Sequence, residues 1–319
     1  MTKPRVSIIT VNYRQAAVTC ALLDSLAANS YREHLEIIVV DNGALEDSTA
    51  LFKQHHPSVK VIVSPENLGF AGGNNLGIRA ATGGFLFLVN NDTVFTDGLV
   101  ENTVRRFVTN PQIGAVSPKI RYFYTPQYIQ YAGFTEINIL TGRNKTIGKN
   151  EQDNGQHDTA RPTPYAHGAA MMLRREVIDR VGFMPEEYFL YYEELDWCAQ
   201  MRRAGFTIWY EPSGVIYHKE SASVGKMSAL KMRYQTRNRL LFMRRNQSQA
   251  AFIFFLCYFF SVTVPINSVR LLLSKQRSLF LTFIQSITEG LSFSPTFLPT
   301  VAPLPAPHSE YVQKTVQAT

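Results

Sequence analysis

A single aspartate that directly follows an apolar segment is the first residue able to do chemistry. Asp92 follows the run FLFLVNN, and a position just beyond a buried strand lets its carboxylate face a ligand. Such a carboxylate can hold Mg²⁺ or Mn²⁺ against a diphosphate, so that the cation neutralises charge on the phosphates and the leaving group. The alternative is that residues 90–93 form only a polar turn or a helix cap. Asp92 is therefore a candidate metal ligand whose role depends on its neighbours.

A cluster of carboxylates between aromatic residues is the second candidate. Glu193, Glu194 and Asp196 lie in YFLYYEELDWCAQMRRAGF, at the predicted start of a helix. Partial burial among aromatic rings raises the pKa of a carboxyl group towards the range of a general base. The alternative is that acids in a first helical turn only complement the helix dipole. Because sugars stack well on aromatic rings, the aromatic density of residues 183–197 favours the catalytic interpretation.

Two weaker signals are a glycine-rich segment and one histidine. NLGFAGGNNLGIRAA, residues 67–81, lets the backbone approach a ligand before a helix begins. It is neither a P-loop nor a good dinucleotide fingerprint, because it lacks GxxxxGK[ST] and follows the third predicted strand. His218 lies near a predicted strand end in GVIYHKES, where a lone histidine is more often structural than a ligand. Both signals depend on what else lies nearby.

Four short apolar runs predict the sheet that must position these residues. They are VSIITV at 6–11, IIVVD at 37–41, VKVIV at 59–63 and FLFLV at 85–89. Runs that are apolar on both faces suit a buried parallel sheet, and helix-length segments separate them. The order predicts a right-handed, doubly wound α/β sheet, whose ligands lie beyond the carboxyl ends of the strands. The polar residues after each strand are therefore expected to line one cleft: Asn12, Asp41, Asn42, Asn90, Asn91 and Asp92.

The remainder of the first two thirds of the chain is less regular. Residues 111–164 predict a sheet extension with loops that face the acceptor. Residues 168–172 then predict a strand, 174–181 a short helix, and 193–204 a helix that ends at Gly205. Three cysteines, odd in number and widely spaced, argue against a disulfide framework and fit a reducing compartment.

The basic residues gather in one part of the chain. Between Glu220 and Glu289 there are ten Lys and Arg side chains and no acidic one, whereas elsewhere 25 acids face 22 bases. Residues 250–269 carry no formal charge and include six aromatic rings. Basic residues beside an apolar segment indicate attachment to anionic lipid at the cytoplasmic face of a membrane, and not a nucleic-acid partner. The alternative is a buried core helix with a solvated flank, and an interfacial helix pair fits at least as well as a bilayer span.

Taken in order, these segments resemble the inverting family 2 glycosyltransferases of the GT-A fold, and most of all rhamnosyltransferase-like members. VSIITVNYR, VVDN, NLGFAGGNNLGIRAA and FLFLVNNDT resemble successive donor-side motifs, and HGAAMMLRREV, MPEEYFLYYEELDWCAQMRRAGF and IYHKESAS resemble the later ones. The resemblance covers residues 6–290. It implies a mostly parallel, Rossmann-like α/β sheet of GT-A type, followed by a C-terminal helical extension that associates with a membrane.

The resemblance also assigns roles to individual residues. The base and ribose of the donor are expected at Thr10, Asn12, Asp41 and Asn42, and the floor of the nucleotide site at Asn67, Gly69, Phe70 and Asn74, with Asn90 and Asn91 beside them. Asp92 and His218 are the expected ligands of Mg²⁺ or Mn²⁺, and Glu194 matches the catalytic base, flanked by Glu193 and Asp196. On the acceptor side we expect Gly168, Tyr191, Tyr192 and Trp197.

Two departures from the family pattern bear on these roles. The DXD region reads Asn90-Asn91-Asp92, so an amide replaces one carboxylate. The acidic motif reads Glu-Glu-Leu-Asp, which makes Asp196 a rival to Glu194 as the base.

The resulting hypothesis is a metal-dependent transferase that moves a sugar such as rhamnose from a dTDP- or UDP-linked donor to a lipid-linked saccharide in cell-surface polysaccharide synthesis. A catalytically inactive scaffold that binds nucleotide sugar or lipid is one alternative, and a nucleotidyltransferase is another. The expected division is a catalytic domain at 1–220, a basic helical linker at 221–249, membrane-associated helices at 250–294 and a Pro-rich, disordered tail at 295–319.

Overall fold

The four apolar runs of the first ninety residues form adjacent parallel strands in a computed structural model, which describes residues 3–220 and 228–292. The strands are β1 (Val6–Asn12), β2 (Leu35–Asn42), β3 (Lys60–Ser64) and β4 (Phe85–Asn90), paired in the order β3-β2-β1-β4. Asn12 lies opposite Asp41 in this register, so the polar residues that end β1 and β2 meet at one edge of the sheet. The predicted α/β sheet is confirmed.

The second half of the sheet is mixed. Its strands are β5 (Thr93–Phe95), β6 (Ile113–Tyr122), β7 (Ile129–Tyr131), β8 (Arg161–Pro162), β9 (Ala170–Arg174) and β10 (Thr207–His218). β9 runs antiparallel to both β4 and β6, whereas β10 runs parallel to β6 and antiparallel to β5. Residues 111–164, expected to form a sheet extension with loops, thus supply β6, a ten-residue strand inside the sheet, and the loops follow after that strand.

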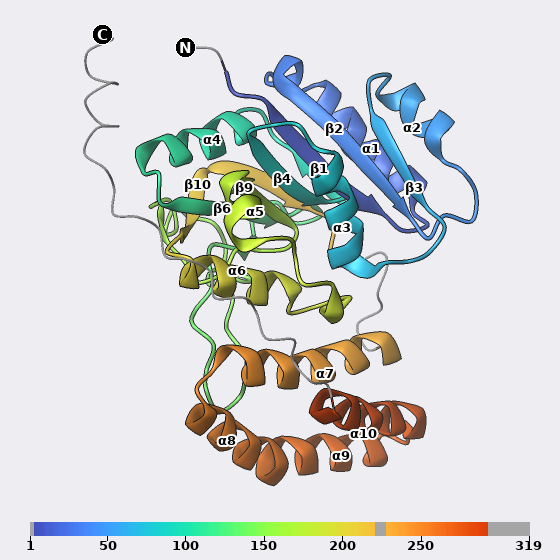
Figure 1. Cartoon of the computed structure of the whole chain (residues 1–319), viewed down its shortest axis with the longest axis vertical. Helices are drawn as coiled ribbons and strands as arrows, with labels where there is room; N and C mark the ends of the chain where they lie inside the picture. The colour runs from blue at the N-terminus through green and yellow to red at the C-terminus, as the bar shows by residue number, and fades with distance from the viewer. Residues whose placement is uncertain (1–2, 221–227, 293–319) are drawn as a thin grey trace.

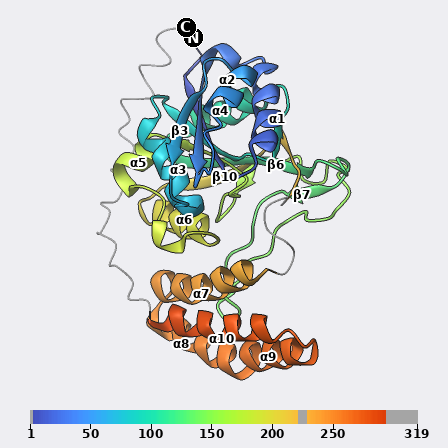
Figure 2. The ribbon, with the colours of Figure 1, turned by 90° about the vertical axis from the view of Figure 1, so that its right-hand side faces the viewer.

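Helices cover both faces of the sheet (Figure 2). They are α1 (Ala16–Ala27), α2 (Thr49–His55), α3 (Gly69–Ala80), α4 (Leu99–Thr109), α5 (Glu176–Val181) and α6 (Glu193–Arg203). The buried side chains of α1, α2 and α4 form one apolar cluster with one face, and those of α3, α5 and α6 form the other. Burial on both sides explains why the strands are continuous apolar runs instead of alternating ones.

Four further helices form a separate layer beside the α3–α6 face (Figure 1). They are α7 (Ala229–Asn246), α8 (Gln249–Tyr258), α9 (Val264–Leu273) and α10 (Arg277–Ser292). α8 runs into α9 through a five-residue π-helical turn, Phe259–Thr263, just before Pro265, which cannot donate a backbone hydrogen bond. Buried side chains of α7–α10 join the same apolar cluster as the sheet, so the predicted division at residue 220 does not separate two cores. The expected disordered tail lies outside the described residues.

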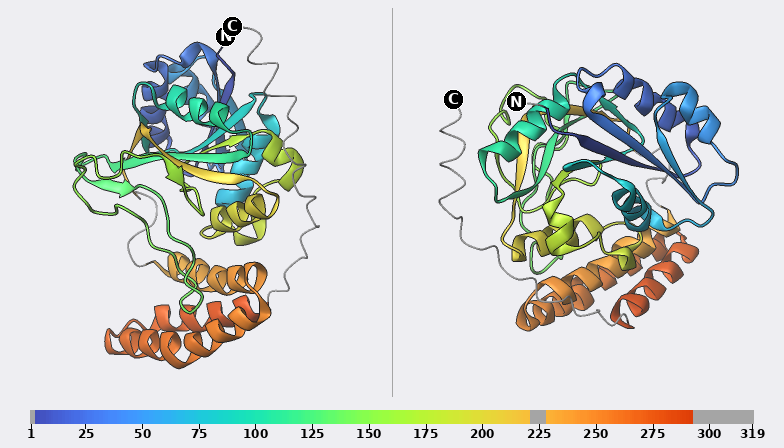
Figure 3. Two further views of the ribbon diagram at one scale, coloured as in Figure 1. Left: turned by 90° about the vertical axis from the view of Figure 1, so that its left-hand side faces the viewer. Right: turned by 45° about the horizontal axis from the view of Figure 1, so that its top comes forward.

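A long hairpin joins the sheet to this helical layer. Its two arms, residues 134–146, are bridged at Phe134 with Thr146 and at Asn138 with Arg143. Figure 3 shows the hairpin leaving the sheet and ending beside α7 and α8. The hairpin therefore brings residues from the middle of the chain against its C-terminal helices.

Candidate active site

The polar residues at the ends of β1 and β2 hold one another in place. Asn12 donates from Nδ2 to Asp41 Oδ1 at 2.7 Å, and its Oδ1 accepts from Thr19 Oγ1 at 2.8 Å. Asn91 in turn donates to Thr19 Oγ1 at 3.0 Å. Asp41 Oδ2 and Thr10 Oγ1 are buried without a hydrogen-bond partner among the described residues. Buried polar atoms are normally satisfied, so these two oxygens point to a ligand at this edge.

Asn42 fixes the turn that leads into α3. Its Nδ2 donates to Asn67 Oδ1 and to the carbonyl of Gly69, both at 3.1 Å, and its Oδ1 accepts from the amide of Leu68 at 2.9 Å. Gly69 has φ +71°, and a Cβ at this position would lie 2.3 Å from the carbonyl oxygen of Phe189. Only glycine fits there, because a side chain would meet both an unfavourable φ and rigid backbone.

Phe70 and Asn74 continue this floor along the first turns of α3. The Phe70 amide donates to the carbonyl of Phe189 at 2.7 Å. Asn74 donates to the carbonyl of Phe70 at 2.9 Å, and its Oδ1 is buried without a partner among the described residues. The glycine-rich segment thus packs its backbone against the loop that precedes α6.

Asp92 and His218 meet across the sheet. His218 is the last residue of β10 and pairs with Thr93, the first residue of β5. Asp92 directly precedes Thr93, and His218 Nε2 lies 3.0 Å from Asp92 Oδ1. Their side chains are 7% and 10% exposed. Gln130 Oε1 lies 2.8 Å from His218 Nδ1 and can only accept, so Nδ1 carries a hydrogen and Nε2 faces Asp92. Asn90 Nδ2 is 3.5 Å from the same Nε2.

This pair fits a weakly held divalent cation. Two adjacent ligands of an octahedral ion at about 2.1 Å lie about 3 Å apart, which matches the observed 3.0 Å between Asp92 and His218. No group of three or more His, Cys, Asp and Glu side chains that could hold a metal ion occurs in residues 3–220 and 228–292. A cation here would therefore complete its shell with water and substrate phosphates, as Mg²⁺ commonly does.

The carboxyl groups of the buried Glu193 and the half-buried Glu194 lie in the first turn of α6. The carboxyl carbon of Glu194 lies 3.8 Å from where a Cβ on Gly168 would stand, and the tip of Phe70 is 3.7 Å from the same point. Burial raises the pKa of Glu194 to about 7, and Oε2 has no partner among the described residues. Burial and the neighbouring Glu194 charge raise the pKa of Glu193 well above its usual value. Glu194 thus combines a near-neutral pKa with an oxygen that has no hydrogen-bond partner among the described residues, and a general base needs both features.

The loop before α6 is held by the helical layer. Asn238 on α7 donates from one amide to the carbonyls of Tyr188, Leu190 and Tyr191, at 2.9, 2.8 and 2.7 Å. Three residues of this loop, Phe189, Tyr191 and Tyr192, have positive φ. A backbone in that region persists only where its surroundings impose it, and Asn238 supplies part of that restraint. Nothing in the sequence marks Asn238 or Gln130 as functional.

His167 connects the acidic helix with the Asp92–His218 pair. Its ring centroid lies 6.5 Å from that of His218, and the next residue, Gly168, borders Glu194. Burial and the neighbouring His218 lower the pKa of His167 to about 3, so its ring is neutral. Segments around residues 92, 167, 194 and 218 therefore lie together at one edge of the sheet.

Comparison with known proteins decides the family. The family described as glycosyl transferase family 2 matches residues 7–182, which is more than half of the chain. The chain belongs to this family. The resemblance stated from the motifs is confirmed.

Two glycosyltransferase sequences and one solved glycosyltransferase structure are similar to this chain. A low-salt glycan biosynthesis hexosyltransferase of Haloferax volcanii is 28% identical over 63% of this chain and 63% of its own length. An N-acetylglucosaminyl-diphospho-decaprenol L-rhamnosyltransferase of Mycobacterium tuberculosis is 22% identical over 76% of this chain and 84% of its own. A Pyrobaculum calidifontis mannosyltransferase, solved with GDP-Man and Mn²⁺, is 18% identical over 100% of this chain and 81% of its own, with a TM-score of 0.55. The GT-A fold is thereby confirmed.

Within this family 2 site, two expected residues turn away from the others. Asp196 is fully buried and binds Gln200 at 2.9 Å, Asn246, and Arg245 at 3.4 Å. It therefore holds α6 to α7 and is not available as a base. Trp197 is also fully buried and donates to the carbonyl of Gly182 at 3.1 Å, so it belongs to the core and not to the acceptor side.

Proposed function

We propose that this chain is an inverting, metal-dependent glycosyltransferase that moves a sugar such as rhamnose from a dTDP- or UDP-linked donor to a lipid-linked saccharide. The proposal rests on the environment of the Glu194 carboxyl group. A buried carboxyl with pKa about 7 and an unsatisfied oxygen can accept the proton of an acceptor hydroxyl at neutral pH. That hydroxyl then attacks the anomeric carbon from the side opposite the nucleotide, in a single displacement.

The donor would occupy the edge formed by β1, β2 and α3. The unsatisfied oxygens of Thr10 and Asp41 can accept hydrogen bonds from base or ribose. Asp92 and His218 would hold the divalent cation, which supplies charge neutralisation on the departing diphosphate. Asn90 and Asn91 contribute polar amides beside the diphosphate without adding negative charge. The Mn²⁺ in the similar mannosyltransferase structure supports this choice of cofactor.

The helical layer supports the proposal of a lipid-linked acceptor and a membrane surface. Residues Gln249–Leu273 form 25 residues of apolar helix with mean hydropathy 1.9 in its best window, of which 11% is buried. Exposed apolar side chains spread along this helix: Ile253, Phe254, Phe260, Ile266, Val269, Leu272 and Leu273. We propose that this surface lies in the cytoplasmic leaflet of the cell membrane as an interfacial layer. The decaprenol-linked substrate in the name of the mycobacterial relative supports the acceptor class.

Release of nucleoside diphosphate from a panel of nucleotide sugars tests the chemistry. We expect Glu194→Gln to lower turnover by about 10²–10⁴-fold, and Asp92→Ala to abolish metal-dependent turnover. Asp179→Asn, an exposed acid on α5, is the matched control and should retain the wild-type rate. If Glu194→Gln and Asp92→Ala both turn over like the wild type, the mechanism is wrong. Donor binding without turnover for every acceptor would instead favour the scaffold alternative.

Flotation with liposomes tests the membrane proposal. We expect the chain to float with vesicles that contain anionic phospholipid, and less with zwitterionic vesicles, because basic residues flank the apolar helices. Resistance to carbonate extraction would argue for a span, and complete absence from both vesicle fractions would refute membrane association.

A further inference from the structure

A basic pocket lies among the C-terminal helices, where the hairpin meets them, apart from the site described above. It has a volume of about 180 Å³, which far exceeds the space needed by one water molecule. Its walls come from the hairpin and from α7, α9 and α10, with lining residues Arg143, Ser228, Lys231, Met232, Gln235, Thr236, Arg239, Asn267, Arg270, Leu279 and Phe283.

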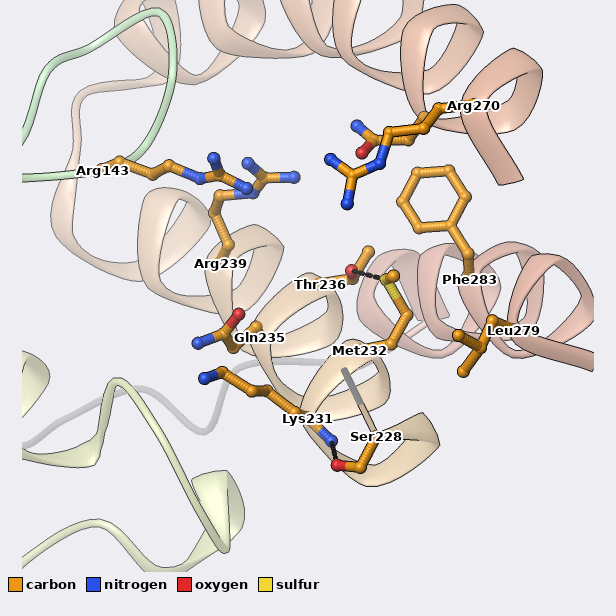
Figure 4. A pocket seen from close by; sticks show the side chains of 11 residues that line it. Arg143, Ser228, Lys231, Met232, Gln235, Thr236, Arg239, Arg270, Leu279 and Phe283 are labelled. Carbon is orange, nitrogen blue, oxygen red and sulfur yellow. Dashed lines mark hydrogen bonds between the residues drawn. The ribbon is translucent and has the colours of Figure 1, made fainter. Parts of the chain in front are cut away.

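Three guanidinium groups are directed into the same space. Figure 4 shows Arg143 from the hairpin, Arg239 from α7 and Arg270 from α9 approaching one another. Arg239 is only 4% exposed, and its Nε is buried without a hydrogen-bond partner among the described residues. Burial and the neighbouring Arg143 lower the pKa of Arg239 to about 10.

No Asp or Glu occurs among the described residues that line this pocket. Arg143 and Arg239 carry like charges and repel one another, and the buried Nε of Arg239 lacks a hydrogen-bond partner among the described residues, which is unfavourable. An anion of high charge and several oxygens would relieve both costs, because arginine forks bind phosphate bidentately.

The pocket borders the catalytic segment on one side. Tyr192, which directly precedes Glu193 and Glu194, donates from its hydroxyl to the carbonyl of Gly142 at 2.9 Å. A Cβ on Gly142 would lie 3.0 Å from Cγ of Arg239. One tyrosine therefore spans the distance between the pocket wall and the acidic helix start.

On the other side the pocket borders an apolar groove. Arg270 lines both: the groove is formed by Pro265, Ile266, Val269, Arg270, Leu273 and Ser274, all on or next to α9. The apolar members of the groove include Ile266 and Val269, which are 61% and 56% exposed. An amphiphile could thus place its anionic group in the pocket and its hydrocarbon on the groove.

We propose that this pocket binds the diphosphate group of an isoprenyl-diphosphate-linked acceptor, with Arg143, Arg239 and Arg270 as its ligands. The proposal rests on the proposed function, since it names where that acceptor is held. The diphosphate then anchors the acceptor at the membrane side, while its first sugars extend past Tyr192 towards Glu194.

Binding of farnesyl diphosphate to the full-length protein in detergent, measured by isothermal titration calorimetry, tests the proposal. We expect Arg143→Gln and Arg270→Gln, both at exposed positions, each to weaken binding by about tenfold or more, as loss of a charge-assisted hydrogen bond does. Lys275→Gln removes an equal charge from an exposed site outside the pocket and should bind like the wild type. Equal binding by all four proteins overturns the proposal.

Two further ligands distinguish the source of the phosphate. Inorganic pyrophosphate should bind at least about tenfold more weakly than farnesyl diphosphate, because it lacks the apolar contacts. Short-chain phosphatidylglycerol, with a single phosphate, should bind more weakly and depend less on the arginines. Pyrophosphate binding as tightly as farnesyl diphosphate would identify a free-anion site, and equal binding of phosphatidylglycerol would identify a general lipid headgroup site; either result refutes the proposal.

Wild-type nucleoside diphosphate release separates this test from that of the function. If the wild type turns over the donor but the arginine variants bind farnesyl diphosphate as tightly as the wild type, only the pocket assignment fails. If binding depends on the arginines but no donor is turned over, the proposed function fails and the lipid diphosphate site remains.

Discussion

Replacement of Glu194 by glutamine should remove activity and yet stabilise the protein at neutral pH. Burial raises the pKa of Glu194 from 4.5 to about 7 in the folded chain. The folded state therefore holds a proton that the unfolded state releases, and the stability of the wild type falls as pH rises from about 4.5 to about 7. Glutamine has no proton to release, so the variant is spared this loss.

The size of the effect follows from the two pKa values. A difference of one pKa unit between the folded and unfolded states changes the free energy of unfolding by about 1.4 kcal/mol. The shift from 4.5 to about 7 would therefore change it by about 3 kcal/mol if Glu194 were fully buried. Because Glu194 keeps some solvent contact, about 2 kcal/mol is a better expectation between pH 5 and pH 8. For a chain of 319 residues that difference corresponds to about 3 °C in Tm.

Thermal unfolding in EDTA at pH 5 and pH 8 measures this directly. The Tm of Glu194→Gln minus that of the wild type should grow from pH 5 to pH 8, while turnover of the wild type rises about tenfold per pH interval below 7 and then levels off. Glu33→Gln, which removes an exposed carboxylate, is the control, and its Tm difference from the wild type should be nearly the same at pH 5 and pH 8. A Tm difference that is the same at both pH values would refute the buried-base account, whatever the activity shows.

Two other substitutions probe the scaffold around the site. Gly69→Ala should lower the free energy of unfolding by more than about 2 kcal/mol, because the new Cβ would meet the carbonyl of Phe189 at a positive φ. Gly84→Ala is the control, because a Cβ there meets no atom within 4 Å and should change Tm little. Thermal unfolding of both variants measures the difference. Asp196→Ala should lower the free energy of unfolding in urea by about 3 kcal/mol, because the buried Arg245 then keeps only Glu187 as a carboxylate partner. An unchanged free energy of unfolding would show that Asp196 and Arg245 are not in contact in solution.

The sheet and the edge that carries the site could be predicted from sequence because local pattern determines them. Strands buried on both faces must be continuous apolar runs, and the polar residues that follow such runs then meet at the carboxyl edge. The sheet extension expected in residues 111–164 could not be divided into its strands, because the β6 sequence IGAVSPKIRY contains glycine and proline, which indicate loops more often than central strands.

The choice between Glu194 and Asp196 shows what local pattern leaves open. Residues two apart on a helix point about 200° apart, so only one of the two can face the ligand. Sequence alone does not say which, since the answer depends on where α7 packs, some fifty residues later. Gln130 and Asn238 were missed for the same reason, because their partners lie 88 residues away at His218 and 47 to 50 residues away before α6.

α7 therefore has two roles that a membrane anchor alone would not need. Asn238 restrains the loop that directly precedes Glu193 and Glu194, while the next residue along the helix, Arg239, lines the basic pocket. Neighbouring residues on a helix point about 100° apart, so the same turn of α7 contacts the loop before α6 through Asn238 and the pocket through Arg239. Occupation of the pocket would reduce the repulsion around Arg239 and so stabilise the packing of α7 against that loop. An acceptor bound there would thus favour the arrangement of Glu194 that its own transfer requires.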